Sequence, residues 1–162
     1  MSDTGMDCEI TPDEAILLNA LDGELHGLLR QVSSSDIDSA ADALFHLKSK
    51  VCPQGVAISR STSAALPILI RISALGKSAV RREVLQVVAR IHRASHAWRK
   101  SAQNARPEYA GNYDEKIQWE IAVDRALSDA MPVLRRFEGD SDAVIAAAAR
   151  DLVMRISSSV SE

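Results

Sequence analysis

The chain has 162 residues, a formal net charge of −3 and hydrophobic residues at 46% of its positions, while aromatic residues make up only 4%. This length is enough for one domain with a continuous core, and so few aromatic residues predict an aliphatic core of closely packed helices. Seven glycines and five prolines are too few for the many turns of an all-β fold, which the composition therefore excludes.

The ends of the chain and its cysteines bear on where the protein works. Residues 1–10 are expected to form a flexible acidic tail without the basic and apolar regions of a secretory signal. Cys8 and Cys52 have no C-x-x-C spacing, so neither a disulfide framework nor a zinc site is expected. The most apolar stretch, residues 64–75, is far too short for a membrane span. Together these features predict a reduced, cytoplasmic protein that does not bind membranes.

The first predicted helix has a clear start signal. Thr11 occupies the N-cap position, Pro12 the first helical position, and Glu14 can complete a capping box. The helix is expected to end near Leu21, because Asp22-Gly23 breaks the pattern.

Hydrophobic periodicity and capping residues predict the later helices. These are expected over residues 24–32, 36–51, 56–75, 78–98, 114–137 and 141–156. Ser78 and Ser141 are the expected N-caps of two of them, and Pro67 should kink or divide the helix that contains it. Residues 99–112 form the longest segment expected to be irregular, and residues 158–162 are expected to fray.

An internal repeat joins two pairs of these helices. Residues 65–69 (Ala-Leu-Pro-Ile-Leu) and 130–134 (Ala-Met-Pro-Val-Leu) match without a gap, at an interval of 65 residues. The match extends over the following helices, in which Val80, Val84, Val87, Val88 and Ile91 correspond to Ile145, Ala149, Leu152, Val153 and Ile156. Repetition of this kind indicates stacked supersecondary units.

A weaker third copy lies 40 residues before the first proline motif, with Gly27 in the position of the proline. Its second helix carries an equivalent apolar set, in which Ala40, Leu44, Leu47 and Val51 correspond to Val80, Val84, Val87 and Ile91. An interval of about 40 residues is the period of HEAT and armadillo units.

In this register the chain resembles bacterial HEAT-repeat proteins over roughly residues 24–157. Each such repeat is a helix pair with a proline-kinked first helix, a polar turn and a second helix that begins with a Val-Arg pair. Pro67 and Val80-Arg81 match that pattern, whereas Ile145-Ala146 replaces Val-Arg in the last unit. The resemblance implies an all-α fold, a short α-α superhelix of about three HEAT-like helix pairs in a single domain over residues 11–157. It also implies a scaffold that binds other proteins.

No arrangement of residues predicts catalysis or a metal site. Residues 71–78 resemble a phosphate-binding G-x-x-x-x-G-K-S loop, but Arg71 replaces its first glycine and a helix precedes it, so a helix–helix turn is expected. His92 and His96 are spaced i, i+4, as two metal ligands on one helix would be, but only His46 could act as a third ligand. We therefore expect a protein that is not an enzyme and has no metal or other cofactor.

Superposing the three units identifies a candidate binding strip. In stacked helix pairs the second helices commonly line one concave binding face. The side chains opposite the apolar set are Asp42, His46 and Lys50 in the first unit, Arg82, Gln86, Arg90 and Arg93 in the second, and Asp151 and Arg155 in the third. This strip is basic in its middle, which suits an acidic partner, and the alternative is an ordinary solvated face.

Aromatic residues near residues 99–112 form a second candidate. Long loops inside compact domains are often functional, and Trp98, Tyr109 and Tyr113 are of the types enriched at binding hot spots. Alternatively, Trp98 and Trp119 fill the space between adjacent helix pairs.

Charge is unevenly distributed along the chain. Residues 1–47 contain ten acidic residues and one basic residue, whereas residues 77–106 contain eight Lys or Arg and one Glu. This asymmetry suits a scaffold that holds an acidic patch of a partner protein, although acidic and basic helices could also simply neutralise each other. The alternatives are nucleic-acid binding through the basic central repeat and neutralisation of a cognate toxin.

Overall fold

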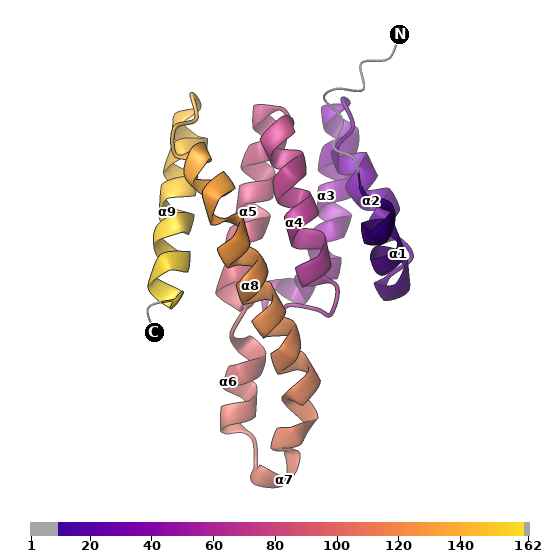
Figure 1. Ribbon diagram of the computed structural model, residues 1–162, viewed down its shortest axis with the longest axis vertical. Coiled ribbons are helices and arrows are strands. Elements are labelled where there is room, and N and C mark those ends of the chain that lie inside the picture. Colours follow the sequence, from indigo (N-terminus) through magenta and orange to yellow (C-terminus); the bar gives the residue numbers. More distant parts are fainter. Residues whose placement is uncertain (1–9, 161–162) are drawn as a thin grey trace.

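The computed structural model describes residues 10–160, and these form helices and short connections without any strand. The fold is therefore all-α, as the sequence predicts. Nine residues of the predicted tail, Cys8 among them, lie outside the described range. In chain order the elements are α1 (Pro12–Leu21), α2 (Leu25–Val32), α3 (Ile37–Val51), the 3-10 helix η2 (Pro53–Gly55), α4 (Thr62–Leu75), α5 (Ser78–Ala94), α6 (Ala97–Asn104), α7 (Pro107–Ala110), the 3-10 helix η3 (Gly111–Tyr113), α8 (Asp114–Phe137) and α9 (Ala143–Val160) (Figure 1).

The helices are arranged in two layers (Figure 1). In one layer α4 packs between α2 and α8, and in the other α5 packs between α3 and α9. Each helix of the first layer also packs on the helix that follows it in the second, as α2 does on α3, α4 on α5 and α8 on α9. Among residues 10–160, none of the helices is both long enough and apolar enough to cross a membrane.

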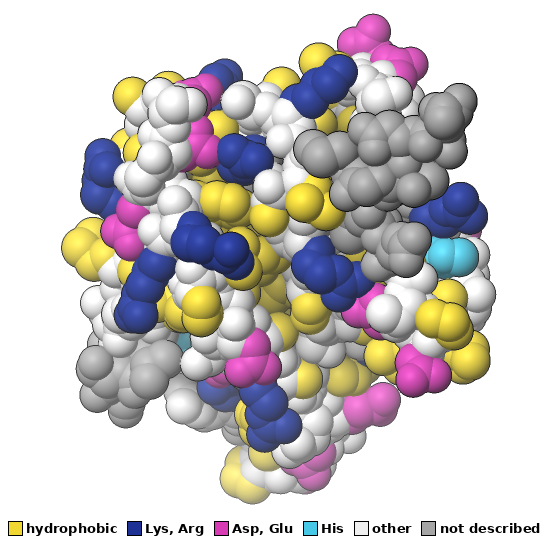
Figure 2. Space-filling view, turned by 45° about the horizontal axis from the view of Figure 1, so that its top comes forward, with side chains coloured by type: hydrophobic (Ala, Val, Ile, Leu, Met, Phe, Trp, Pro, Cys, Tyr) yellow, Lys and Arg dark blue, Asp and Glu magenta, His cyan; other side chains and the backbone are white. Residues whose placement is uncertain are grey.

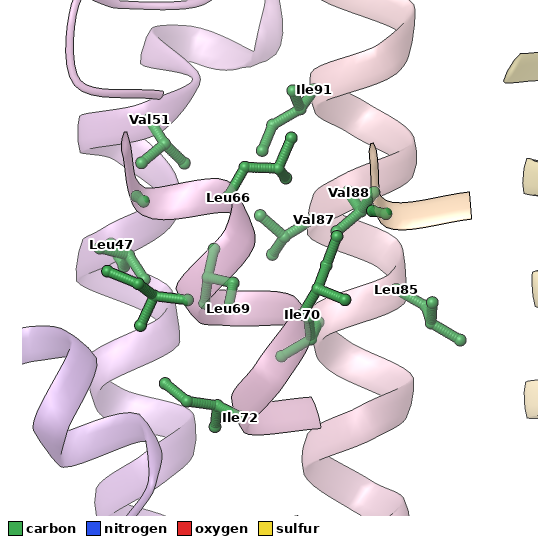
Figure 3. Close-up of a cluster of buried hydrophobic side chains, with 14 of the residues drawn as sticks. Leu47, Val51, Leu66, Leu69, Ile70, Ile72, Leu85, Val87, Val88 and Ile91 are labelled. Carbon is green, nitrogen blue, oxygen red and sulfur yellow. The ribbon is translucent and has the colours of Figure 1, made fainter. Parts of the chain in front are cut away.

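The core lies between the layers and is aliphatic at its centre. Figure 3 shows side chains of α4 that point between α3 and α5. The buried residues in this part of the core are Leu47, Val51, Leu66, Leu69, Ile70, Ile72, Leu85, Val87, Val88 and Ile91. Burial of such side chains stabilises the fold by roughly 1.5–3 kcal/mol each, so the middle helix pair is supported from both sides.

The predicted repeat register agrees with the positions of the helices. α5 begins at Ser78 and α9 at Ala143, which is the predicted interval of 65 residues. The corresponding apolar residues of both helices are buried, except for the half-buried Val153. In the first unit Ala40, Leu44, Leu47 and Val51 are also buried. The apolar pattern therefore identified the side of each helix that faces the core.

The prediction that residues 99–112 are irregular is wrong. They contribute to α6, α7 and η3, and together with the first part of α8 they form an extension beyond the two layers (Figure 1). The predicted helix over residues 78–98 ends at Ala94, and a new helix begins at Ala97. The distant Glu120 carboxylate accepts hydrogen bonds from the Trp98 and Arg99 N–H groups in the first turn of this new helix. This partner was not apparent from local sequence.

The predicted helix over residues 56–75 begins six residues late, at Thr62. The preceding segment instead satisfies the open C-terminal carbonyls of α3, because Ser59 Oγ donates to Lys50 O (2.8 Å) and Thr62 Oγ1 donates to Val51 O (2.6 Å). Gln54 and Gly55 have positive φ angles of 57° and 73°, which turn the chain sharply after α3. The side-chain hydrogen bonds thus override the helical pattern here.

Several predicted helix ends also differ. Ser78 is the first residue of α5 rather than its cap, and Asp142 rather than Ser141 caps α9 by accepting from Val144 N (2.9 Å). α9 continues to Val160 instead of fraying from residue 158. Pro67 does not divide α4, which runs unbroken across it. The turn between α4 and α5 is Gly76-Lys77, within the loop-like segment, where a helix–helix turn was predicted.

The capping box at the start of α1 is confirmed and has a second role. Glu14 Oε1 accepts from Thr11 N at 2.9 Å, and Thr11 Oγ1 accepts from Glu14 N at 3.2 Å. Both carboxylate oxygens of Glu14 also accept hydrogen bonds from Arg71 at 2.8 Å. This bidentate pair fastens α1 to α4, and the hydrogen bonds from Arg71 are the main reason that the pKa of Glu14 is lowered from 4.5 to about 2.

Stability should therefore depend on Glu14 in acid. The carboxylate binds a proton near pH 4.5 in the unfolded chain but only near pH 2 in the folded one, so its stabilising effect is present above pH 4.5 and is lost as the pH falls towards 2. We expect Glu14→Gln to reduce the loss of unfolding free energy between pH 5 and pH 3, measured by urea denaturation. The exposed neighbour Asp13→Asn is the control. Equal acid sensitivity of Glu14→Gln and wild type would contradict this role.

Candidate functional site

The predicted strip lies on the layer of α3, α5 and α9, and Figure 1 shows α5 between the other two helices. We call the side of this layer that points away from the core the outer face, defined by Asp42, His46, Lys50, Arg82, Gln86, Arg90, Arg93, Asp151 and Arg155. All nine are exposed or half-buried. Their intramolecular partners differ, and this decides which of them are available to bind another molecule.

Lys50 is occupied by neighbouring acids. Its Nζ lies 2.9 Å from Asp22 Oδ2 and 3.1 Å from Glu24 Oε1, both in the connection between α1 and α2. The hydrogen bond between Lys50 and Asp22 raises the pKa of Lys50 and lowers that of Asp22. Lys50 therefore joins α3 to the start of the chain. On the same helix, Asp42 and His46 form an exposed pair at 3.8 Å.

The arginines of α5 fall into two groups. Near its start, Arg81 binds Asp140 and Arg82 binds Asp142, each at 2.7 Å, so both connect α5 to the turn between α8 and α9. Towards its end, Arg90 and Arg93 form no ion pair with any described residue. The positive charges near the start of α5 are thus paired with acidic side chains, whereas those near its end have no acidic partner among the described residues.

Arg90 lies against the turn that follows α3. A Cβ atom on Gly55 would lie 3.3 Å from Arg90 Nη1, and Gly55 has a φ of +73°. The close approach of Arg90 and the left-handed backbone conformation therefore both favour glycine at this position. Arg90 and Arg93 also lie near the buried Cys52 thiol, whose pKa is raised chiefly by burial, with a smaller lowering effect of the two arginines. The structure therefore brings the two unpaired arginines to the junction of α3 and α5.

The α9 part of the outer face is self-paired. Arg155 Nε lies 2.8 Å from Asp151 Oδ2, and both side chains are about half exposed. Exposed pairs of this kind contribute little to stability and leave little net charge.

The predicted aromatic residues divide between structural and exposed positions. Trp98 Nε1 donates to Ile58 O at 2.9 Å, Lys116 Nζ lies 4.2 Å from the centre of the Trp98 ring, and Tyr113 packs beside it. Trp98 and Trp119 both pack against the core, which agrees with the alternative that they fill the space between helix pairs. Tyr109 is exposed on α7, in the extension rather than on the outer face.

Sequence reasoning missed Phe45. Its side chain is 67% exposed on α3, with Lys48 Nζ 5.6 Å above the ring and the His46 ring at its edge. The sequence did indicate its exposure, because Phe45 falls outside the apolar set of its helix. An exposed Phe beside His46 adds an apolar contact to the outer face.

Figure 2 shows a face on which Lys and Arg are scattered among Asp, Glu and hydrophobic side chains. Within residues 10–160 no group of three or more His, Cys, Asp or Glu side chains could hold a metal ion.

Comparison with protein-family models, with curated proteins and with solved structures gives no match to this chain.

Proposed function

We propose that the helix pairs α2–α3, α4–α5 and α8–α9 form a short HEAT-like α-α superhelix that works as a non-enzymatic, protein-binding scaffold in the cytoplasm. The two layers of side-by-side helices support this proposal, as does the 65-residue interval between α5 and α9. Stacked helix pairs offer extended surfaces that suit recognition of another macromolecule.

The observation that carries the proposal is the unpaired charge of Arg90 and Arg93. The remaining outer-face cations Lys50, Arg82 and Arg155 each have an acidic partner within the chain. Arg90 and Arg93 have none among the described residues, and Arg is enriched at binding hot spots. A carboxylate-rich patch on a partner would supply the missing charge.

Phe45 extends this site onto α3. An aromatic side chain left exposed beside a charged patch is a typical anchor of a protein interface, where an apolar centre is surrounded by polar contacts. The proposed partner is therefore a protein with acidic side chains around an apolar one. A nucleic acid would use the arginines but would gain less from Phe45, and a toxin is one possible protein partner.

Charge reversal tests this site. A photo-crosslinking residue placed at Gln86 should capture a defined acidic protein from the native host, and the purified pair should then bind in vitro. We expect Arg90→Glu/Arg93→Glu to weaken that binding at least about tenfold, because opposite charges become like charges. Its unfolding free energy should change by less than about 0.5 kcal/mol, as for other surface substitutions.

Arg106→Glu/Arg125→Glu, at two exposed arginines outside the outer face, is the matched control and should bind normally. Equal binding by both double variants would exclude the outer face. Micromolar binding of duplex or single-stranded DNA at physiological salt, with a steep salt dependence, would favour a nucleic-acid function instead.

A further inference from the structure

A cleft with a volume of about 390 Å³ opens where the C-terminal part of α5 meets α8 and the C-terminal part of α9. Small-ligand sites have volumes of about 300–1,000 Å³. The aliphatic residues Leu127 and Ile156 line it, and both are almost completely buried. No residue of the outer face lines the cleft, so it is a separate site with an apolar surface of its own.

One wall of the cleft holds a fixed hydrogen-bond donor. Arg99 Nε donates to Glu120 at 3.0 Å, and Arg99 Nη2 donates to Asp124 Oδ2 at 2.6 Å and to Ser95 O at 3.1 Å. Nη1, with its two N–H groups, has no hydrogen-bond partner among the described residues. A guanidinium held by three hydrogen bonds through two of its nitrogens, with the third nitrogen unused, is already oriented to bind a carboxylate.

Acceptors lie beside this donor. Asp124 binds Arg99 through Oδ2, while Oδ1 has no hydrogen-bond partner within residues 10–160. Ser159 Oγ donates to Arg155 O and lies 3.0 Å from His92 Nε2. A hydroxyl has one hydrogen, so the contact of Ser159 with Arg155 O fits the His92 tautomer that donates from Nε2, and this neutral tautomer has Nδ1 as an acceptor.

We propose that this cleft binds a free α-amino acid with an aliphatic side chain. The ligand carboxylate would bind Arg99 Nη1, its ammonium group would bind Asp124 Oδ1 and His92 Nδ1, and its side chain would contact Leu127 and Ile156. The adjacent Arg99 and Asp124 groups match the adjacent opposite charges of a free amino acid. A ligand with only one of these groups would leave Arg99 Nη1 or Asp124 Oδ1 without a hydrogen-bond partner in the cleft.

Calorimetric titration of the full chain with L-leucine, N-acetyl-L-leucine and L-leucinamide tests the proposal. L-Leucine should bind with a Kd below about 1 mM, and each blocked analogue at least about tenfold more weakly. Absence of binding at about 10 mM L-leucine would overturn the proposal. Equal affinity for all three ligands would also overturn it, because only the apolar surface would then be recognised.

Variants locate the site. Asp124→Asn should weaken L-leucine binding at least about tenfold, because the ammonium group loses its counter-charge. Asp129→Asn, at an exposed position of the same helix, should bind as wild type does. Unchanged binding by a folded Asp124→Asn protein would overturn this location. If that variant does not fold, nuclear magnetic resonance shifts of His92 and His96 on addition of L-leucine to wild type decide the question.

The pH dependence provides an independent test. Burial is the main cause that lowers the pKa of His92, and His96, Arg155 and Arg93 lower it further, whereas Asp124 raises it. His92 is therefore neutral at pH 7, and L-leucine binding should weaken as the pH falls and Nδ1 gains a proton. Stronger binding at pH 5 than at pH 7.5 would contradict the assigned role of His92.

Discussion

Glu120→Ala should be among the most destabilising single substitutions in this chain. The carboxylate is fully buried and accepts hydrogen bonds from Trp98 N (2.8 Å), Arg99 N (3.0 Å) and Arg99 Nε (3.0 Å). Its removal leaves the Trp98 and Arg99 N–H groups in the first turn of α6, and Arg99 Nε, without an acceptor. Breaking a buried charge pair costs about 3–5 kcal/mol, and urea denaturation would measure this loss of unfolding free energy.

The loss should also be visible locally. Amide hydrogen exchange over residues 97–113 should accelerate, because Glu120 joins α6 to α8. Glu120→Gln should have an intermediate effect, and Gln118→Ala, at an exposed position on the same helix, should have almost none. Wild-type stability of Glu120→Ala would show that α6 is held by other contacts, such as that of Trp98 with Ile58.

Arg81→Ala should produce the second large effect. Arg81 Nε donates to Ser73 O at 2.8 Å and Nη2 donates to Ala74 O and Gly76 O at 3.2 Å, so the side chain covers the C-terminal carbonyls of α4. Its guanidinium also lies 5.1 Å from the centre of the Phe137 ring. Loss of several hydrogen bonds to a charged donor should lower the unfolding free energy by about 3 kcal/mol.

Arg82→Ala is the adjacent control. Arg82 forms one ion pair, with Asp142, and its side chain is more exposed than that of Arg81. Its buried Nε has no hydrogen-bond partner. Arg82→Ala should therefore lower the unfolding free energy much less than Arg81→Ala. Arg81→Lys keeps the charge but not the planar fork, and should fall between wild type and Arg81→Ala. If Arg81→Ala and Arg82→Ala lowered the melting temperature equally, Arg81 would not have the proposed role of capping the C-terminal carbonyls of α4.

Arg81 distinguishes the middle helix pair from the other two. Its counterparts in the register are Ala41 and Ala146, neither of which can reach the carbonyls of a preceding helix or an acid in the next turn. In the middle unit Arg81 instead connects α4, α5 and the turn that contains Asp140. The pKa of Asp140 is lowered by the N–H of Asp142 and by Arg81, so this turn stays charged. The arginine that carried the family resemblance thus has a structural role.

The binding face was only partly predictable from the sequence. The apolar spacing correctly placed Gln86 and Arg93 on the exposed side of α5. It could not show that Lys50 and Arg82 are paired, because their acids lie 28 and 60 residues away. The predicted strip contains only charged and polar residues and so leaves out Phe45, although Phe45 lies outside the apolar set of its helix.

The sequence by itself determined the all-α class, the positions of most helices and the side of each helix that is buried, because helical periodicity and capping residues are local or periodic signals. The tertiary structure decided where the helix over residues 78–98 breaks and how the segment after it folds, because Glu120 satisfies the start of α6 from a distant turn of α8. It also decided which arginines remain free, since an ion pair depends on the positions of two helices in space. Arg90 and Arg93 were two basic residues among eight in the sequence of residues 77–106, and the packing of α5 left them without acidic partners among the described residues.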